Sequence, residues 1–513
     1  MTTIVERTGD VATTDGTRRR PSSFAMDLVA TFVTVGLTSV SGLIVIRLVA
    51  SGLGPDEFGA YSISRRLLST VASIAMLGMG VAIPREMALA TDEGMRDNLL
   101  LSGCVISLVP LCFGLLVGLL FEGAWSRQVF LDDAHVGLYR MSLALIVGHA
   151  LFNLLYAYYR GTQRFSAANG WQLGSSAVLP ILVALLIAPT KRADWVTGAM
   201  ALSMAIALLP LGYHLQLALR RGRPLSGVLR AGRTLLRYGV PRILAGFAAA
   251  SLFSVGPFLA PHFGGLREAG YLSAGQSILG VLEGGLAAFG IVALPKVSQM
   301  VGAGRHAEVG KAVQEMLAMV AHLGLFAGMQ ALIWAPFIVE LVLGPQFAGA
   351  VPIMRMILLA LVPYLAFALL RSVVDAVDER PINTINLLIA VAVTAAVGIV
   401  MALSGLGAQG LAAGTTFGVF LLGLLTAGFL HRRFAFSFDW SRLGFVFFVN
   451  LSLAALAVFA IRIVPWPTSL LPRFCVAGGI EVLLFVLYGY YLHASDASWV
   501  REFRTRAMSL IKR

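Results

Sequence analysis

Long apolar runs alternate with short polar segments over nearly the whole chain. A transmembrane helix needs about 20 apolar residues to cross a hydrocarbon core of about 30 Å, and runs of this length recur throughout the sequence. The pattern therefore predicts an all-α polytopic membrane protein with about fourteen transmembrane helices. They are expected at 24–49, 59–83, 98–121, 138–159, 168–189, 195–219, 238–261, 270–294, 313–340, 349–371, 382–403, 407–430, 444–463 and 472–493.

The chain also carries an internal repeat at an offset of 211 residues. The repeat relates residues 54–84 to residues 265–295, and the shared positions include Gly54 with Gly265 and Pro84 with Pro295. The offset joins the second predicted helix to the eighth, so both copies run in the same direction. Such a parallel repeat predicts two six-helix lobes related by a pseudo-twofold axis along the membrane normal, with two additional helices at the C-terminus.

This division gives the expected domain boundaries. They are an N-terminal tail at 1–23, an N-lobe at 24–219, a basic linker at 220–237, a C-lobe at 238–430, extra helices at 444–493 and a C-terminal tail at 494–513. Most of the 39 Lys and Arg residues fall on segments that share a side with the N-terminus. The positive-inside rule then places both termini in the cytoplasm, and we expect the protein in the plasma membrane. The basic linker is expected to lie on the membrane surface as an amphipathic segment.

The composition supports a membrane protein and changes the interpretation of the charge. Hydrophobic residues make up 58% of the chain and charged residues 13%, against about 25% charged residues in soluble domains. The formal net charge is +13. Because most cations face the cytoplasmic side, we expect this charge to meet anionic lipid, and no nucleic-acid partner is predicted.

Motifs for enzymatic chemistry are missing from the sequence. It contains no P-loop, no HExxH, no clustered Cys and His, and no nucleophile elbow. No segment is long enough for an added soluble domain. We therefore expect a transporter and not an enzyme. It should act on its ligand between the two lobes. We expect no metal site and no cofactor, apart from possible coupling to H⁺ or Na⁺.

Several cations lie inside predicted helices, where a charge costs about 2.5–3.5 kcal/mol at mid-bilayer and normally faces a cavity or a partner. Arg65 and Arg66 lie about 10 Å below the outer end of the second helix. Arg355 enters the tenth helix to the same depth, Arg242 lies just inside the cytoplasmic end of the seventh, and Arg47 is near the outer end of the first. These five arginines are the candidates for a cationic substrate-binding cleft.

Other polar residues inside the helices have two readings each. Glu283 lies near the centre of the eighth helix, where it either binds a coupling ion or pairs with an arginine across the cavity. His149 and Asn153 are one turn apart on the fourth helix. They either share a polar face in the cavity or form an interhelical hydrogen bond.

Four stretches resemble the polysaccharide flippases of the multidrug/oligosaccharidyl-lipid/polysaccharide exporter superfamily. They are RLVASGLGPDEFGAYS at 47–62, YRGTQRF at 159–165, LRYGVP at 236–241 and LGPQFAGAVPIMR at 343–355. The resemblance covers about residues 24–430. It implies a bilobed bundle that carries a polyprenyl-pyrophosphate-linked oligosaccharide to the outer leaflet for cell-surface polysaccharide synthesis by alternating access. It also implies contact with membrane lipids and with polysaccharide polymerase machinery.

Three alternatives stay open. Fourteen helices depart from the twelve that are common among O-antigen flippases and match the lipid II flippase branch, whose last two helices are associated with a lipid groove. A cation-coupled multidrug exporter of the same fold would use Glu283. A membrane-embedded polysaccharide polymerase would also be long, basic and polytopic, although the short external loops and the duplication favour a transporter.

Overall fold

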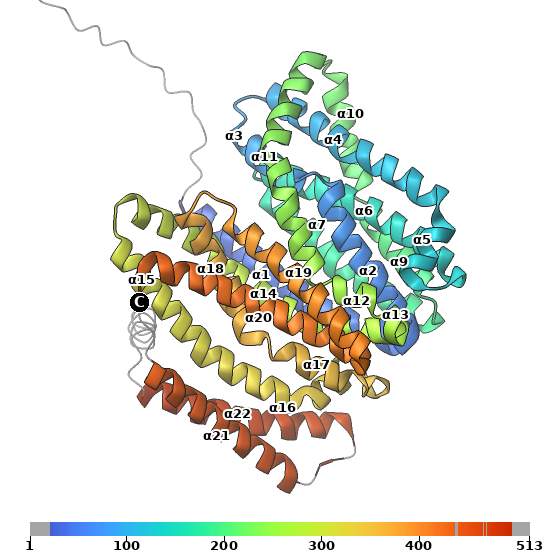
Figure 1. Cartoon of the computed structure of the whole chain (residues 1–513). Coiled ribbons are helices and arrows are strands. Elements are labelled where there is room, and N and C mark those ends of the chain that lie inside the picture. The colour runs from blue at the N-terminus through green and yellow to red at the C-terminus, as the bar shows by residue number, and fades with distance from the viewer. Residues whose placement is uncertain (1–20, 437–439, 465, 468, 495–513) are drawn as a thin grey trace, which may run out of the picture.

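The computed structural model describes residues 21–436, 440–464, 466–467 and 469–494, and these residues form helices with no strand among them (Figure 1). The α-helices of the first half are α1 (Pro21–Leu53), α2 (Pro55–Ala75), α3 (Met79–Leu89), α4 (Glu93–Leu120), α5 (Glu122–Phe130), α6 (Val136–Gly161), α7 (Phe165–Leu173), α8 (Leu179–Ile187), α9 (Ala193–Ala205) and α10 (Leu208–Arg220). The remaining α-helices are α11 (Leu225–Leu252), α12 (Val255–Leu259), α13 (Pro261–Gly264), α14 (Leu266–Gly302), α15 (His306–Met319), α16 (Leu325–Val342), α17 (Ala350–Leu358), α18 (Leu361–Val377), α19 (Ile382–Met401), α20 (Gly407–Phe434), α21 (Trp440–Ile463) and α22 (Leu470–Ala494).

These helices follow the order of the fourteen predicted spans. Within the described part of the chain, nine helices are long and apolar enough to cross a membrane, and two bent pairs raise the number to as many as eleven. The bent pairs are α2 with α3, at 46°, and α17 with α18, at 48°. One of the nine segments, 382–434, contains both α19 and α20. The arrangement is consistent with fourteen spans.

A tight helix contact explains the bend between α2 and α3. Leu77 and Gly78 have φ angles of 43° and 74°, in the left-handed region that favours glycine. A Cβ atom on Gly78 would lie 2.3 Å from the carbonyl oxygen of Gly239 on α11. Glycine therefore serves two purposes at position 78, because it permits the turn and lets the two backbones touch.

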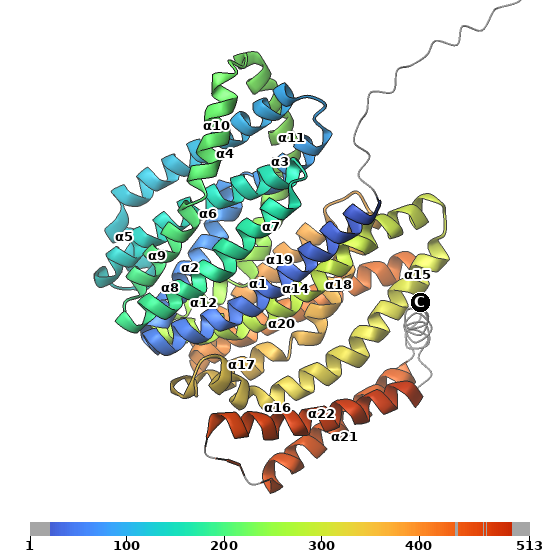
Figure 2. The ribbon, with the colours of Figure 1, turned by 180° about the vertical axis from the view of Figure 1, so that it is seen from behind.

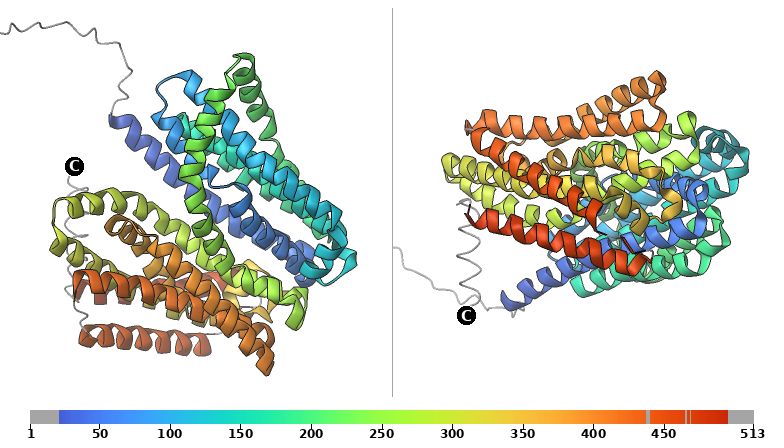
Figure 3. Two further views of the ribbon diagram at one scale, coloured as in Figure 1. Left: turned by 45° about the horizontal axis from the view of Figure 1, so that its top comes forward. Right: turned by 90° about the horizontal axis from the view of Figure 1, so that it is seen from below.

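The helices form two bundles (Figures 1 and 2). One contains α2 to α10 and the other contains α14 to α20, while α1 and α11 each contact both. α1 packs on α7 and α8 of its own half and on α14 and α16 of the other half. α11 packs on α2 and α4 and also on α19, and it runs between the bundles in the left view of Figure 3. The largest cluster of buried apolar side chains extends through both bundles.

The two copies of the repeat meet along α2 and α14, and we call this contact the seam. Gly54 precedes α2 with φ 81° and ψ 172°, and Gly265 precedes α14 with φ 87° and ψ 178°. Gly59 and Gly270 then touch, since a Cβ on Gly270 would lie 3.1 Å from the Cα of Gly59. A Cβ on Gly59 would lie 1.8 Å from the carbonyl oxygen of Leu266. Residues related by the 211-residue offset therefore have the same turn geometry and face each other across the seam.

A charged pair lies at the same end of this seam. Arg267 Nη2 is 2.8 Å from Asp56 Oδ2, and the two residues are themselves 211 positions apart. Both side chains are exposed. The ion pair and the glycine contact together hold the first turns of α2 and α14 against each other.

The segment expected as a separate basic linker differs in the structure. Residues 225–252 form the continuous helix α11, so the region 225–237 belongs to the same helix as the following span. The turn before it is tied to α4, where Arg223 Nη2 lies 2.7 Å and Arg221 Nη1 3.2 Å from Asp97 Oδ2. Packing of α11 on α4 supports helical structure through the basic stretch.

The two C-terminal helices attach to the second bundle beside α16 (Figure 1). Tyr488 on α22 stacks on Phe326 of α16 with ring centroids 4.5 Å apart, and its hydroxyl donates to the carbonyl of His322 at 2.8 Å. At the other end of α22, Arg473 lies 2.8 Å from Glu340. These contacts fix α22 along the length of α16.

Candidate functional site

The seam between the bundles carries two of the predicted arginines, and they point to different neighbours. Arg66 is partly buried and donates from Nη2 to the carbonyl oxygen of Ser273 on α14, at 3.2 Å. Arg65 is exposed, and its charge lies within electrostatic reach of His149 on α6. Adjacent residues on a helix point about 100° apart. Arg66 thus bridges the bundles, whereas Arg65 presents its charge beside α6.

A second group of cations lies at the other end of the α2 and α3 span. The guanidinium carbon of Arg242 lies 3.7 Å from the centre of the Tyr238 ring, and that of Arg85 lies 4.3 Å from it. Arg242 also donates to the carbonyl of Tyr238 at 2.7 Å, and Arg85 forms an ion pair with Glu86. An arginine from α3 and one from α11 therefore meet at one aromatic ring, which we call the Tyr238 cluster (Arg85, Tyr238 and Arg242).

An acidic residue of the second bundle lies within electrostatic reach of one member of this cluster. Asp375 on α18 lies within electrostatic reach of both Arg371 and Arg242. Asn383 holds the region in place, because its Nδ2 donates to Asp375 Oδ1 and to the carbonyl of Arg371, each at 2.8 Å. The cations of the Tyr238 cluster therefore have a carboxylate from the other bundle nearby.

Sequence reasoning identified Arg242 by its depth but missed Arg85, Tyr238 and Asp375. Arg85 and Tyr238 are far apart in the chain, so no local spacing indicates their contact. The available signal was the Pro-cation ending shared by the two copies of the repeat, Pro84-Arg85 and Pro295-Lys296. It placed a cation at the end of each copy without showing what that cation meets.

The other two predicted arginines bind the backbone of α16. Arg47 Nη1 donates to the carbonyl of Glu340 at 2.9 Å, and Arg355 Nε donates to the carbonyl of Leu332 at 3.1 Å. Arg355 is exposed, while Arg47 lies against Gly344. The structure thus does not bring Arg47 and Arg355 together with the Tyr238 cluster. It places them on the side of the molecule where α1, α16 and α17 meet.

His149 and Asn153 form a bond within one helix. Asn153 Nδ2 donates to the carbonyl of His149 at 3.0 Å. The Nδ1 atom of His149 is buried and makes no hydrogen bond with any described residue. The charge of Arg65 lies within electrostatic reach of this ring.

Glu283 belongs to α14, but its side chain lies outside the described residues. The helix itself continues without a break from the seam glycines to Gly302. The two readings of Glu283, ion coupling and pairing with an arginine, both remain predictions.

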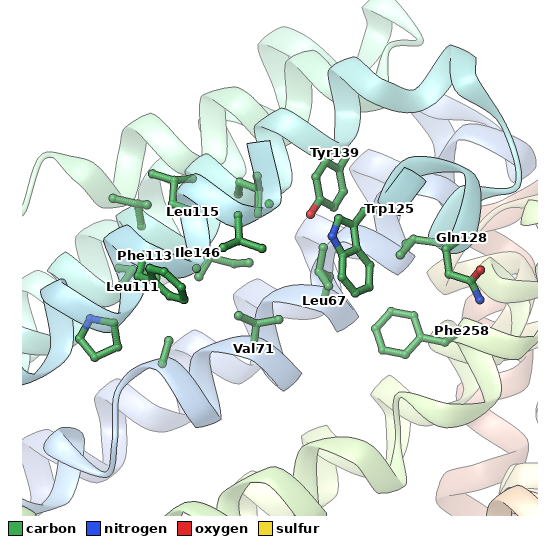
Figure 4. A pocket seen from close by; sticks show the side chains of 18 of the residues that line it. Leu67, Val71, Leu111, Phe113, Leu115, Trp125, Gln128, Tyr139, Ile146 and Phe258 are labelled. Carbon is green, nitrogen blue, oxygen red and sulfur yellow. The ribbon is translucent and has the colours of Figure 1, made fainter. Parts of the chain in front are cut away.

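An apolar cavity of about 560 Å³ lies beside the seam, between the first bundle and the short helices α12 and α13 (Figure 4). Leu67 and Val71 of α2 form one wall, and Phe258 of α12 lies opposite Trp125 of α5. Tyr139 contributes one of the few polar atoms in the lining. The lining suits a hydrocarbon chain better than a sugar, because few of its groups can form hydrogen bonds.

The equivalent region of the second bundle differs. There α1 packs on α16, and Arg47 holds it through the carbonyl of Glu340. On the other flank, the short helices α12 and α13 take the place of a long helix such as α1. The two flanks of the molecule are therefore not equivalent, although the seam is.

Comparison with known protein families gives one match. The chain matches the family described as "Polysaccharide biosynthesis protein" over residues 26–301, which is more than half of its length. No curated protein matches the chain.

Solved structures match at low sequence identity. A multidrug resistance MATE family transporter of the MOP superfamily, in an inward-facing conformation, is 17% identical with a TM-score of 0.65, over 80% of this chain and 98% of that chain. The lipid II flippase MurJ, in an inward closed conformation, is 12% identical with a TM-score of 0.70, over 92% and 99%. A MOP superfamily transporter from Pyrococcus furiosus is 17% identical with a TM-score of 0.55, over 80% and 95%.

At these identities the likeness shows the fold, and that fold agrees with the predicted polytopic helical bundle. The family match covers the first bundle, α11 and most of α14. The chain is therefore a multi-pass membrane protein of the polysaccharide biosynthesis protein family, with the fold of the MOP superfamily transporters.

Proposed function

We propose that this protein is a flippase that moves a polyprenyl-pyrophosphate-linked oligosaccharide across the plasma membrane for cell-surface polysaccharide synthesis. The Tyr238 cluster is the observation that carries the proposal. It brings Arg85 and Arg242 from α3 and α11 to one aromatic ring, with Asp375 of the second bundle within electrostatic reach of Arg242. Two guanidinium groups at one place suit a pyrophosphate, because arginine binds phosphate oxygens through paired charge-assisted hydrogen bonds.

Arginines lie at two depths along the α2 and α3 span, which suits an anionic cargo that crosses the membrane. Arg65 and Arg66 lie near one end of the α2 and α3 span and Arg85 near the other. In the proposed cycle the pyrophosphate first meets the Tyr238 cluster and then moves toward Arg65 and Arg66. Asp375 offers Arg242 an alternative partner when the cargo has left.

The proposed movement is alternating access between two lobes, 24–219 and 238–430, with both termini in the cytoplasm and the helices of 444–493 outside the moving pair. In this orientation the contact of Gly59 with Gly270 closes the external end of the seam. Opening that end requires the first turns of α2 and α14 to separate. The protein performs no covalent chemistry in this scheme.

Lipid II is the second candidate cargo. The match to the lipid II flippase covers 92% of this chain, against 80% for the MATE transporter. Both cargoes carry a polyprenyl pyrophosphate, so the same cations serve either one. The sugar part of the cargo distinguishes the two candidates.

Transport into proteoliposomes tests the proposal. The cargo is a fluorescent polyprenyl-pyrophosphate oligosaccharide, with a lipid II analogue in parallel. Because a hydrogen bond to a charged group contributes about 1.5–3 kcal/mol, we expect Arg85→Ala with Arg242→Ala to lower transport at least about tenfold. The pair Arg65→Ala with Arg66→Ala is expected to do the same.

The matched control is Arg230→Ala with Arg237→Ala, which removes two exposed charges from α11 outside the Tyr238 cluster. Transport by this control should stay within about twofold of wild type. Equal transport by the control and the two test pairs would overturn the cationic path. Movement of the lipid II analogue alone would replace the proposed cargo with lipid II.

A further inference from the structure

A second cavity lies on the outer flank of the second bundle, away from the seam. Its volume is about 630 Å³, and it is formed by α15, α18, α20 and the first turn of α21. Most of its wall is apolar, and it includes Val362 and Ala366 of α18 and Phe420 and Leu424 of α20. Phe420 and Leu424 are 47% and 54% exposed, so the apolar wall is open to the surroundings of the bundle.

One end of this groove is polar. Lys311 and Glu315 from α15, His431 from the last turn of α20, and Trp440 and Arg442 from the first turn of α21 all line it. The described lining contains a lysine, an arginine and one glutamate, so its basic side chains outnumber its acidic ones. Trp440 is 75% exposed, as is usual for an aromatic residue at a membrane interface.

The length of the apolar part fits one leaflet. His431 at the polar end and Phe420 at the apolar end are eleven positions apart on α20, which is about 16 Å at 1.5 Å per residue. Half of a hydrocarbon core of about 30 Å is about 15 Å. The groove therefore runs from the level of the lipid headgroups to the middle of the membrane.

The floor of the groove has room for a chain. A Cβ atom on Gly428 would meet nothing within 4 Å. By contrast, a Cβ on Gly423, one turn and a half away, would lie 2.5 Å from the carbonyl oxygen of Pro363, where α18 and α20 touch. The space at Gly428 is thus part of the open groove, and the contact at Gly423 fixes its wall.

We propose that this groove binds one anionic phospholipid, with the phosphate at Lys311 and Arg442 and one acyl chain along α20. The cationic mouth selects a negatively charged headgroup, and the apolar wall selects a hydrocarbon chain. The site is separate from the Tyr238 cluster, because none of the residues that line the groove belongs to α3 or α11. It therefore stands or fails independently of the proposed transport function.

Native mass spectrometry of the full-length protein tests this inference, with phosphatidylglycerol and phosphatidylcholine of the same chain length as probes. Wild type should retain one phosphatidylglycerol, and at least about fivefold less phosphatidylcholine. Lys311→Ala with Arg442→Ala should lower phosphatidylglycerol retention at least about fivefold. Gly428→Leu, which fills the groove, should lower retention of both lipids.

Two controls match these variants. Arg230→Ala with Arg237→Ala removes the same charge at a distance from the groove, and Gly479→Leu adds the same side chain on α22, where the site is also open. Both should retain phosphatidylglycerol as wild type does. Thermal unfolding identifies any variant that fails to fold, and the charge pair and the glycine variant then test the groove separately.

Equal retention of the two lipids by wild type would overturn the proposal, as would unchanged retention by both folded groove variants. Inorganic phosphate is the third probe. Phosphatidylglycerol should raise the unfolding temperature of wild type while phosphate alone does not. The same rise with phosphate alone would show a phosphate site in place of a lipid site.

Discussion

Single residues in this protein act through contacts that only the fold creates. The Tyr238 ring receives one arginine from α3 and one from its own helix. Depth along a helix was enough to select Arg242, because a charge inside an apolar run needs a partner. It did not reveal Arg85, which follows the end of the predicted span 59–83, where solvation alone would explain a cation.

Among the glycines that the structure describes, Gly59 has the least room for a side chain. A Cβ at this position would lie 1.8 Å from the backbone oxygen of Leu266, and no side-chain rotation relieves a clash with backbone. We expect Gly59→Ala to lower stability by about 1–3 kcal/mol, as overpacking does. Thermal unfolding in detergent measures the change.

The control for this prediction is Gly80→Ala on α3, where a Cβ would meet nothing within 4 Å. An alanine there should leave the unfolding temperature unchanged or slightly higher, since glycine is unfavourable inside a helix. If Gly59→Ala unfolds at the same temperature as Gly80→Ala, the close approach of α2 and α14 is not part of the stable structure.

At the scale of the helices, the sequence predicted order and position well, since each span needs a long apolar run. It did not predict where the spans break. The bend at Gly78 depends on its approach to Gly239, a contact between distant segments. The basic stretch 220–237 was predicted as a separate linker, and its sequence does not show that 225–237 continues into the next span or that Arg223 pairs with Asp97 of α4.

The first turns of α2 and α14 are expected to separate during transport. We predict that joining Asp56→Cys to Arg267→Cys with a short thiol-reactive linker lowers transport at least about tenfold, because the linker keeps this end closed. The background is Cys112→Ser with Cys475→Ser, since both native cysteines are exposed. Proteoliposome transport is measured before and after treatment.

Each single-cysteine variant, treated in the same way, should transport at its untreated rate. Full transport by the linked protein would mean that α2 and α14 stay together throughout the cycle. A cleavable linker adds a second check, since its reduction should restore transport.

For the whole molecule, the internal repeat at an offset of 211 residues was enough to predict two equivalent halves. The seam has the expected likeness, with paired glycines and matching turns. The two flanks differ from each other. On one flank α1 binds α16 through Arg47, and on the other the short helices α12 and α13 border an apolar cavity. The helices that differ, α1, α12, α13 and α16, lie outside the repeated residues 54–84 and 265–295, so the repeat does not predict how they pack.

Coupling to an ion gradient is a property of this scale, because it links an ion site to the movement of both lobes. We expect Glu283→Gln to abolish any dependence of transport on a proton or sodium gradient. A neutral amide can neither release a proton nor supply a negative charge to a sodium ion. Transport is compared with and without each gradient. Glu268→Gln, at the start of the same helix, is the control and should keep the dependence of wild type.

If the Glu283→Gln protein still responds to the gradient, Glu283 has a structural role. If wild type transports without any gradient, the driving force is the cargo's own concentration difference, and Glu283 is not a coupling residue.

The pair Asp56 and Arg267 has a consequence for the history of the chain. The two residues occupy equivalent positions and face each other across the seam. In a symmetric homodimer of a single-lobe ancestor, one codon would specify both positions, and two like charges would meet on the axis. Opposite charges became possible only after duplication gave the two positions separate codons. The glycine contact of the seam is compatible with a symmetric homodimer, whereas the ion pair requires two copies that have diverged.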